Sequence, residues 1–174
     1  NGSVDATVKL DLEAGAVVHH EPTPGKGSVV RRMFADIDAD IYVMADGDGT
    51  YDPAEAPLLI KRLVDDDLDM VVGYRANSAG RRGHAVGNRA LSRLYRWLFG
   101  PGFRDVLSGY RAFSRCYVKS FPAVSTGFEI ETEMTVHASQ LRLPAAEVEI
   151  SYRARPEGSV SKLRTFSDGW RILR

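Results

Sequence analysis

The sequence lacks the features that mark several classes of protein. Cys116 is its only cysteine, which excludes a disulfide framework and a cysteine-based zinc site and favours a reducing compartment. No segment approaches the roughly 20 apolar residues that a membrane helix needs, and the first ten residues lack the zones of a signal peptide. The 23 basic and 23 acidic residues cancel, which argues against nucleic acid as the main partner. Any binding site for an anion must therefore come from a local group of basic residues and not from the net charge of the chain.

Length and composition predict a single domain spanning residues 1–174. With 44% hydrophobic and 26% charged residues, a chain of 174 residues can bury one sizeable core. It contains no internal repeat and no low-complexity segment. It does not begin with methionine, and its first residues look like a turn and a helix that follow a strand. We therefore expect the natural protein to continue on the N-terminal side.

Helices and strands are expected to alternate along the chain. Apolar runs and alternating patterns predict strands, while capping residues and helical periodicity predict helices. Such an alternation favours an α/β domain with a parallel sheet, whose ligands bind beyond the carboxyl ends of the strands. Gly, Ser and charged residues predict flexible loops at about 76–87 and 155–163. The expected helices lie near residues 4–14, 28–35, 53–64, 88–100 and from about 128, and the strands near 16–20, 40–45, 69–75, after the turn at 105–109, and at 146–154.

The stretch DIYVMADGDGTYDP, residues 40–53, ends a buried strand in two aspartates, Asp46 and Asp48. If the chain stays extended there, both side chains lie on one side, because a strand has a period of two residues. Paired carboxylates suit Mg²⁺ or Mn²⁺, which keep positions open for phosphate oxygens. The alternative is that both are ordinary turn residues. A calcium loop does not fit, because the glycine and glutamate that it requires would fall on Tyr51 and Pro57.

A second candidate for phosphate binding is the sequence Gly25-Lys26-Gly27. Glycines would let backbone amides approach a phosphate, and Lys26 would add a positive charge. However, Val30 stands where a dinucleotide-binding fingerprint needs its third glycine, and no Gly-Lys-Ser/Thr motif follows. Without further support, a simple loop is the better explanation of this segment.

Seven short motifs in a fixed order resemble family 2 glycosyltransferases of the GT-A fold, in the branch of dolichol-phosphate mannose synthase and polyprenyl-phosphate glycosyltransferases. The resemblance covers essentially the whole chain. Each motif alone is permissive, whereas their common order is specific. The segments are NGSVDAT, PGKG, ADGD (the D-x-D metal motif), VVGYR, DVLSGYRAF, FEIE and RPEGSVSKL.

The resemblance implies a GT-A, Rossmann-like three-layer domain with a mostly parallel central sheet. The two strands that open the fold in this family, and that bind the nucleobase and ribose, have no counterpart in the sequence. The implied activity is inverting transfer of a sugar from a UDP- or GDP-sugar to a polyprenyl phosphate, with Mg²⁺ or Mn²⁺, on the cytoplasmic face of the cell membrane. Transfer to a saccharide hydroxyl, or a non-catalytic metal-binding domain, remains the alternative.

By resemblance, Asp48 is the first choice as metal ligand, and Asp46 shares the ion or contacts the ribose. Asp105 matches the family's acidic residue near the acceptor and is the candidate catalytic base. A phosphate acceptor has a second pKa of about 6 and hardly needs a base, so Asp105 would then position groups. A sugar hydroxyl would need general base catalysis. Asp105 as a plain turn residue is the simpler alternative.

The matched motifs also imply a set of cations around the donor diphosphate and the acceptor phosphate. Arginine suits such sites because its guanidinium binds phosphate with two parallel hydrogen bonds. The loop at 155–163 is expected to order over a bound donor. Glu129 and Glu131 could reach the site, although acidic residues in a first helical turn also favour the helix dipole. The candidate donor- and phosphate-binding residues are Lys26, Arg75, Arg111, Arg155, Ser161 and Lys162.

Overall fold

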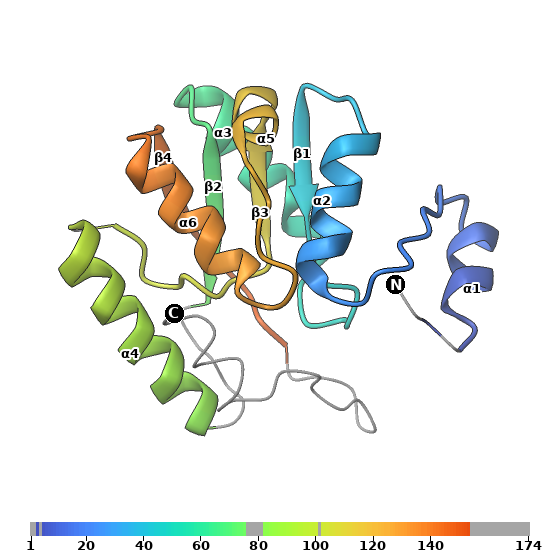
Figure 1. Ribbon diagram of the computed structural model, residues 1–174, viewed down its shortest axis with the longest axis horizontal. Helices are drawn as coiled ribbons and strands as arrows, with labels where there is room; N and C mark the ends of the chain where they lie inside the picture. Colours follow the sequence, from blue (N-terminus) through green and yellow to red (C-terminus); the bar gives the residue numbers. More distant parts are fainter. Residues whose placement is uncertain (1–2, 4, 76–81, 101, 154–174) are drawn as a thin grey trace.

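The computed structural model describes residues 3, 5–75, 82–100 and 102–153, and a mixed four-stranded sheet lies at the centre of this part of the chain (Figure 1). The strands have the order β1-β3-β2-β4. β3 pairs antiparallel with both β1 and β2, and β4 pairs parallel with β2. β1, β2 and β4 therefore run in one direction, so their carboxyl ends meet at one edge of the sheet. The strands are β1 (Ile41–Met44), β2 (Met70–Arg75), β3 (Arg111–Ser114) and β4 (Ala145–Ile150).

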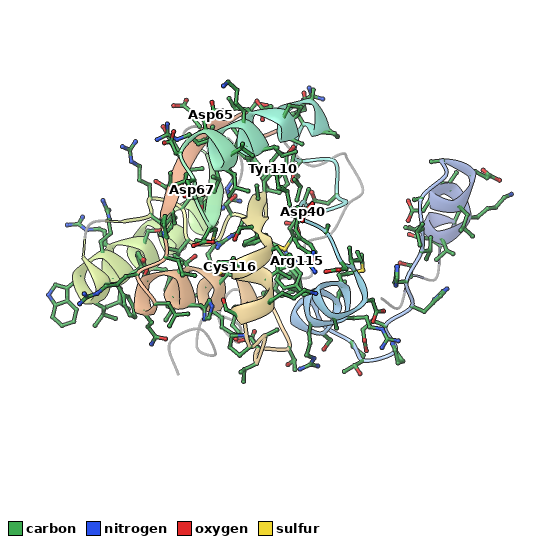
Figure 2. The ribbon with its side chains drawn as sticks, turned by 90° about the horizontal axis from the view of Figure 1, so that it is seen from above. Asp40, Asp65, Asp67, Tyr110, Arg115 and Cys116 are labelled. Carbon is green, nitrogen blue, oxygen red and sulfur yellow. The ribbon has the colours of Figure 1, made fainter. Side chains whose placement is uncertain are left out.

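Helices cover both faces of this sheet, as the three-layer prediction requires. Figure 2 shows α3 on one side of the strands and α2, α5 and α6 on the other, with α4 beside α6. The short helix α1 stands apart in both views and buries none of its residues. The helical elements are α1 (Thr7–Glu13), α2 (Lys26–Asp36), the 3-10 turn η1 (Pro53–Glu55), α3 (Ala56–Asp65), α4 (Arg82–Phe99), α5 (Arg115–Ser120) and α6 (Ile130–Gln140).

The sheet separates two apolar cores through the two-residue period of its strands. Met70 and Val72 of β2 and Phe113 of β3 face the larger core, on the side of α2, α5 and α6. Val71 and Ala112 face the smaller core, on the side of α3. All five side chains are fully buried. This alternation fixes the register of the central strands, because a shift by one residue would exchange the two faces.

Several sequence-based expectations need correction. Residues 16–20, expected as a strand, are irregular, and Val17 is 82% exposed. Strand-forming residues alone do not make a strand without a neighbouring strand to pair with. Residues 82–87, expected in a flexible loop, belong to α4, which begins at Arg82; residues 76–81 lie outside the described part. Helix α5 was not anticipated; Ser114 caps it by accepting a hydrogen bond from the Tyr117 N–H.

Within the described residues, no helix combines the length and the apolar character needed to cross a membrane.

Candidate active site

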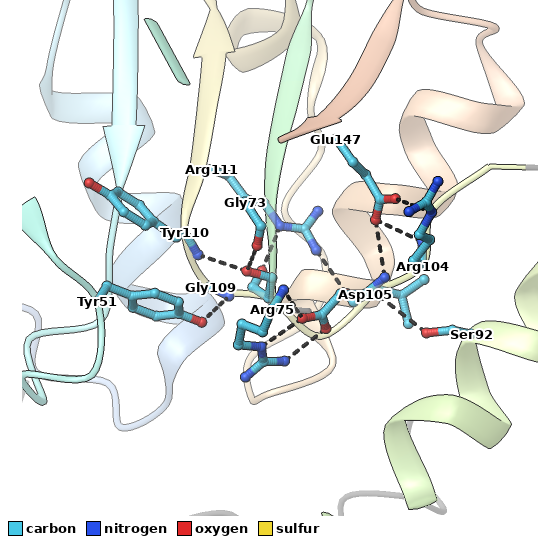
Figure 3. Close-up of polar contacts among 12 residues, drawn as sticks. Tyr51, Gly73, Arg75, Ser92, Arg104, Asp105, Gly109, Tyr110, Arg111 and Glu147 are labelled. Carbon is cyan, nitrogen blue, oxygen red and sulfur yellow. Dashed lines mark hydrogen bonds and ion pairs between the residues drawn. The ribbon is translucent and has the colours of Figure 1, made fainter. Parts of the chain in front are cut away.

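The predicted functional residues gather at the edge where β1, β2 and β4 end. Asp46 and Asp48 follow β1, and Arg75 is the last residue of β2. Asp105 belongs to the segment that leads into β3, whose amino end lies at the same edge because β3 is antiparallel. Figure 3 shows Arg75 and Asp105 turned toward each other at this edge. The topology thus places the candidate ligands where α/β sheets bind their substrates.

Lys26, the first residue of α2, connects two carboxylates at this edge. Its ammonium nitrogen lies 2.5 Å from Asp46 Oδ1 and also donates to Glu131 Oε1. Burial alone would lower the pKa of Lys26, but Glu131 and Asp46 outweigh it and raise this pKa well above its usual value. Glu131 is 5% exposed, and its second oxygen has no hydrogen-bond partner among the described residues. The Lys26 ammonium therefore forms ion pairs with both Asp46 and Glu131, and Glu131 belongs to the site.

Asp48 is oriented by the turn that follows it. Its Oδ1 accepts hydrogen bonds from Thr50 N at 3.2 Å and from Thr50 Oγ1 at 2.6 Å. The described residues contain no group of three or more His, Cys, Asp or Glu side chains placed to hold a metal ion. Two carboxylates nevertheless fit Mg²⁺ or Mn²⁺, since these ions commonly take one or two carboxylates and complete their shell with phosphate and water. The donor set at Asp46 and Asp48 therefore fits a divalent ion that arrives with a diphosphate.

Asp105 and Arg75 form a bidentate ion pair. Arg75 Nε lies 2.6 Å from Asp105 Oδ2, and Arg75 Nη2 lies 2.8 Å from Oδ1. Burial alone would lower the pKa of Arg75, but the hydrogen bonds and charge of Asp105 raise it. The guanidinium also sits 5.0 Å from the centre of the Tyr152 ring. Both oxygens of the candidate base are thus engaged by a fixed cation, and Arg75 is first of all the partner of Asp105.

The segment after Asp105 is fixed from several sides. Ser108 Oγ donates to Gly73 O of β2 at 2.5 Å, and the Gly109 N–H donates to Tyr51 Oη at 3.0 Å (Figure 3). Burial raises the pKa of Tyr51, so its phenol stays neutral. Tyr51 lies three residues after Asp48. Its hydrogen bond therefore connects the turn at residues 45–49, which we call the acidic turn, to the segment leading into β3.

Gly109 is required by close packing against the acidic turn. A Cβ atom at this position would lie 2.6 Å from Asp46 Oδ2 and 3.0 Å from Lys26 Nζ. Any side chain there would displace the contact between Asp46 and Lys26. The glycine of the Ser-Gly-Tyr motif thus gives the acidic turn the space it occupies.

Arg111 does not belong to the predicted cationic clamp. It is fully buried, and all three of its side-chain nitrogens donate to the protein: Nε to Ser108 O at 2.8 Å, Nη2 to Val106 O at 2.8 Å and Nη1 to Thr135 Oγ1 at 2.9 Å. Burial lowers the pKa of Arg111. A guanidinium committed in this way cannot bind phosphate; it fastens the segment before β3 to α6.

The Gly25-Lys26-Gly27 segment also differs from the phosphate-loop interpretation. Gly27 N donates to Thr126 O at 3.1 Å, and a Cβ on Gly27 would lie 2.1 Å from Ser125 O. Gly25 has φ of +122°, and a Cβ there would lie 2.1 Å from Thr126 O. The two glycines let α2 start against the backbone of the segment before α6. Lys26 is the part of this motif that reaches the site.

The remaining candidates fall outside the cluster or outside the described residues. Glu129 Oε1 accepts from Gly127 N at 3.0 Å, and its other oxygen is buried without a partner among the described residues. This local contact explains Glu129 as a residue of the turn before α6. Three candidates, Arg155, Ser161 and Lys162, lie outside the part of the chain that the structure describes.

Two residues of the site were not anticipated. Tyr51 is 7% exposed and binds Gly109, as described above. Glu147 of β4 accepts hydrogen bonds from the backbone of Arg104 and Asp105. The sequence offers no signal for Glu147, because in the alternating strand it shares the polar face with the exposed Glu149, opposite to Val148 and Ile150.

Comparison with known proteins identifies relatives in sequence and in structure. No family model matches the chain. It is 39% identical to glycosyltransferase AglJ of Haloferax volcanii over 97% of its own length and 57% of that protein. It is 33% identical to the low-salt glycan biosynthesis hexosyltransferase Agl6 of the same organism, over its whole length and 43% of that protein. The chain therefore spans about half the length of these relatives.

Solved structures support the same assignment. Glucosyl-3-phosphoglycerate synthase of Mycobacterium tuberculosis superposes with a TM-score of 0.77 at 24% identity, covering 99% of this chain and 64% of that one. Its complex with Mn²⁺, UDP-glucose and phosphoglyceric acid superposes with a TM-score of 0.71 at 26% identity, covering 89% and 59%. The chain therefore has the GT-A fold, and its sequence is similar to that of glycosyltransferases.

Proposed function

We propose that the chain is the core of an inverting glycosyltransferase that moves a sugar from a UDP- or GDP-sugar to a polyprenyl phosphate. The observation that carries this proposal is the arrangement at the sheet edge. A carboxylate pair, Asp46 and Asp48, lies there with Lys26, and Asp105 is held by Arg75 at the same edge. The relationship to AglJ and to a synthase solved with UDP-glucose supports a nucleotide-sugar donor.

Asp48 and Asp46 would hold Mg²⁺ or Mn²⁺. When bound, such an ion acts as a Lewis acid and neutralises charge on the departing nucleoside diphosphate. The related synthase solved with Mn²⁺ and UDP-glucose supports this choice. Lys26 adds a fixed positive charge beside Asp46, while Glu131 holds the other side of the ammonium. The protein's own contribution is to place these charges before the donor arrives.

The ion pair between Asp105 and Arg75 favours an acceptor that is already ionised. A sugar hydroxyl would have to compete with Arg75 for both oxygens of Asp105 before it could lose its proton to that carboxylate. A phosphate monoester, with a second pKa of about 6, attacks as an anion at neutral pH and needs no base. Asp105 then orients Arg75, whose guanidinium suits a phosphate. Phosphoglyceric acid, with which the related synthase was solved, also carries a phosphate group.

The exposed surface of α4 supports an acceptor at a membrane. Trp97 is 79% exposed and Leu98 is 57% exposed, next to the exposed Arg93 and Arg96. The 18-residue helix carries four arginines and no acidic residue. Apolar and aromatic side chains among cations suit the interface of an anionic lipid layer. α4 also lies beside the Asp105 segment, since Val106 N donates to Ser92 Oγ at 3.5 Å. We propose that the enzyme acts on the cytoplasmic face of the cell membrane.

Transfer assays on the full-length natural protein test the function. With Mn²⁺ and radiolabelled UDP- or GDP-sugars, label should move to polyprenyl phosphate and not to an oligosaccharide. Asp48→Ala should reduce the rate at least about 100-fold, because it removes stabilisation of the leaving diphosphate. Asp65→Ala is the control, since Asp65 is exposed on α3 and contacts Lys61. If calorimetry detects no nucleotide binding to the wild type, the proposed enzymatic function is refuted. If label appears on oligosaccharides alone, the proposed lipid-phosphate acceptor is refuted.

A further inference from the structure

Glu147 lies at a position where strand geometry calls for an apolar residue. It is on β4 opposite Val72 of β2, and its neighbours Val148 and Ile150 belong to the smaller core. Glu147 therefore points to the opposite face, toward the larger core. Its side chain is 11% exposed. Burying a carboxylate there is unfavourable unless polar groups compensate for the lost water.

The compensation comes from the backbone of the candidate catalytic segment. Glu147 Oε1 accepts from Arg104 N at 2.7 Å and from Asp105 N at 3.1 Å, as Figure 3 shows. Burial raises the pKa of Glu147, while these two amides oppose the shift. The other oxygen lies 3.9 Å from Arg104 Nε, in a pair that is largely exposed on the arginine side and therefore weak. The hydrogen bonds from the two backbone N–H groups are thus the main interaction of Glu147.

Asp105 is consequently held at two points. Its carboxylate binds the Arg75 guanidinium, and its backbone N–H binds Glu147. The two partners belong to neighbouring strands, β2 and β4, that pair in parallel. Together they fix both the position of the main chain and the direction of the side chain. Residues held in this way from rigid strands are placed more precisely than residues on free loops.

We propose that Glu147 is a positioning residue for the transfer reaction, and that it sets the place of Asp105 and Arg75 through the backbone amides of residues 104 and 105. This inference rests on the proposed function. Glu147 acts through geometry, because one side-chain oxygen accepts both amides. Its negative charge is not the property that matters.

Two conservative variants separate geometry from charge. Glu147→Gln keeps an oxygen at the same reach and loses the charge, whereas Glu147→Asp keeps the charge and is one methylene too short to reach the amides. We expect Glu147→Asp to lower kcat about 10- to 100-fold with the donor KM within about threefold, since small misplacements of reacting groups carry penalties of this size. Glu147→Gln should stay within about threefold of the wild type. Glu149→Gln is the control, because Glu149 lies on the same strand, is exposed and accepts a hydrogen bond from the Tyr74 hydroxyl at the surface.

Hydrogen exchange provides a readout that does not need activity. The amides of residues 104 and 105 should exchange at least about tenfold faster in Glu147→Asp, and at wild-type rates in Glu147→Gln and Glu149→Gln. Faster exchange in Glu147→Asp supports the inference even if the wild type transfers no sugar, a result that would refute the proposed function alone. Unchanged exchange in Glu147→Asp overturns it. A loss of kcat in Glu147→Gln equal to that in Glu147→Asp also overturns it, because charge would then be the property that matters.

Discussion

The two segments that form the site are built differently. Residues 45–49, the acidic turn after β1, alternate between exposed and half-buried, and their side chains are held by short local contacts and by Lys26. Residues 105–110, before β3, are buried except for the half-buried Leu107. They are fixed by β2, β4 and Tyr51, and by Arg111 at the start of β3. The difference suggests two roles. The open turn has the exposure that a ligand-binding segment needs, whereas the conformation of the buried segment is fixed before any ligand binds.

The buried segment should be the more sensitive to mutation, with the largest effect at Arg111. Arg111→Met removes three hydrogen bonds and leaves the carbonyls of Ser108 and Val106 buried without a donor. We expect the free energy of unfolding to fall by about 4 kcal/mol. Urea denaturation followed by circular dichroism measures it. Arg115→Met is the control, because Arg115 is half exposed and pairs with Asp38, so its loss should cost about 0.5 kcal/mol. Equal losses for the two variants would contradict the contrast between the segments.

At the open turn, the sensitive point should be Lys26 of α2, which connects Asp46 of the turn to the buried Glu131. Lys26→Met leaves the buried Glu131 without its cation, and we expect a loss of about 2 kcal/mol in unfolding free energy. The double variant Lys26→Met with Glu131→Gln should recover at least half of this loss, because no buried charge then remains. Lys61→Met, in an exposed pair with Asp65, should change stability by about 0.5 kcal/mol or less. If the double variant is no more stable than Lys26→Met, the pairing of Lys26 with Glu131 does not account for the stability of this part of the site.

The sequence predicts β1 and β2 well because each contains a short apolar run with clear limits. It also places Asp46 and Asp48 at the sheet edge, since strand ends in an α/β sheet determine that edge. Asp52 and Pro53 likewise mark the start of the helical segment, and Asp52 accepts from Ala54 N as a helix cap. These inferences depend on local patterns alone.

The orientation of charged residues could not be predicted in the same way. Arg111 begins β3 two residues before Phe113, so both point to the larger core, but this follows only when the start of the strand is known. Two of its acceptors are backbone carbonyls, which leave no trace in a sequence. Arg75 matches the motif equally well and yet faces the site. Motif position identifies the neighbourhood of a residue, whereas its partners decide its role.

The junction between the two segments offers the finest test of the comparison, at Gly109. In Gly109→Ala, the new Cβ would lie 2.6 Å from Asp46 Oδ2 and 3.0 Å from Lys26 Nζ. Both contacts involve ends of side chains that can shift, so we expect a loss of only about 1 kcal/mol in unfolding free energy. The shift nevertheless moves the predicted metal ligand, and Mn²⁺-dependent binding of UDP or GDP, measured by calorimetry, should weaken about tenfold. Gly47→Ala is the matched control, since a Cβ at Gly47 meets nothing within 4 Å. Equal nucleotide affinity in the two variants would show that the open turn does not depend on the buried segment for its geometry.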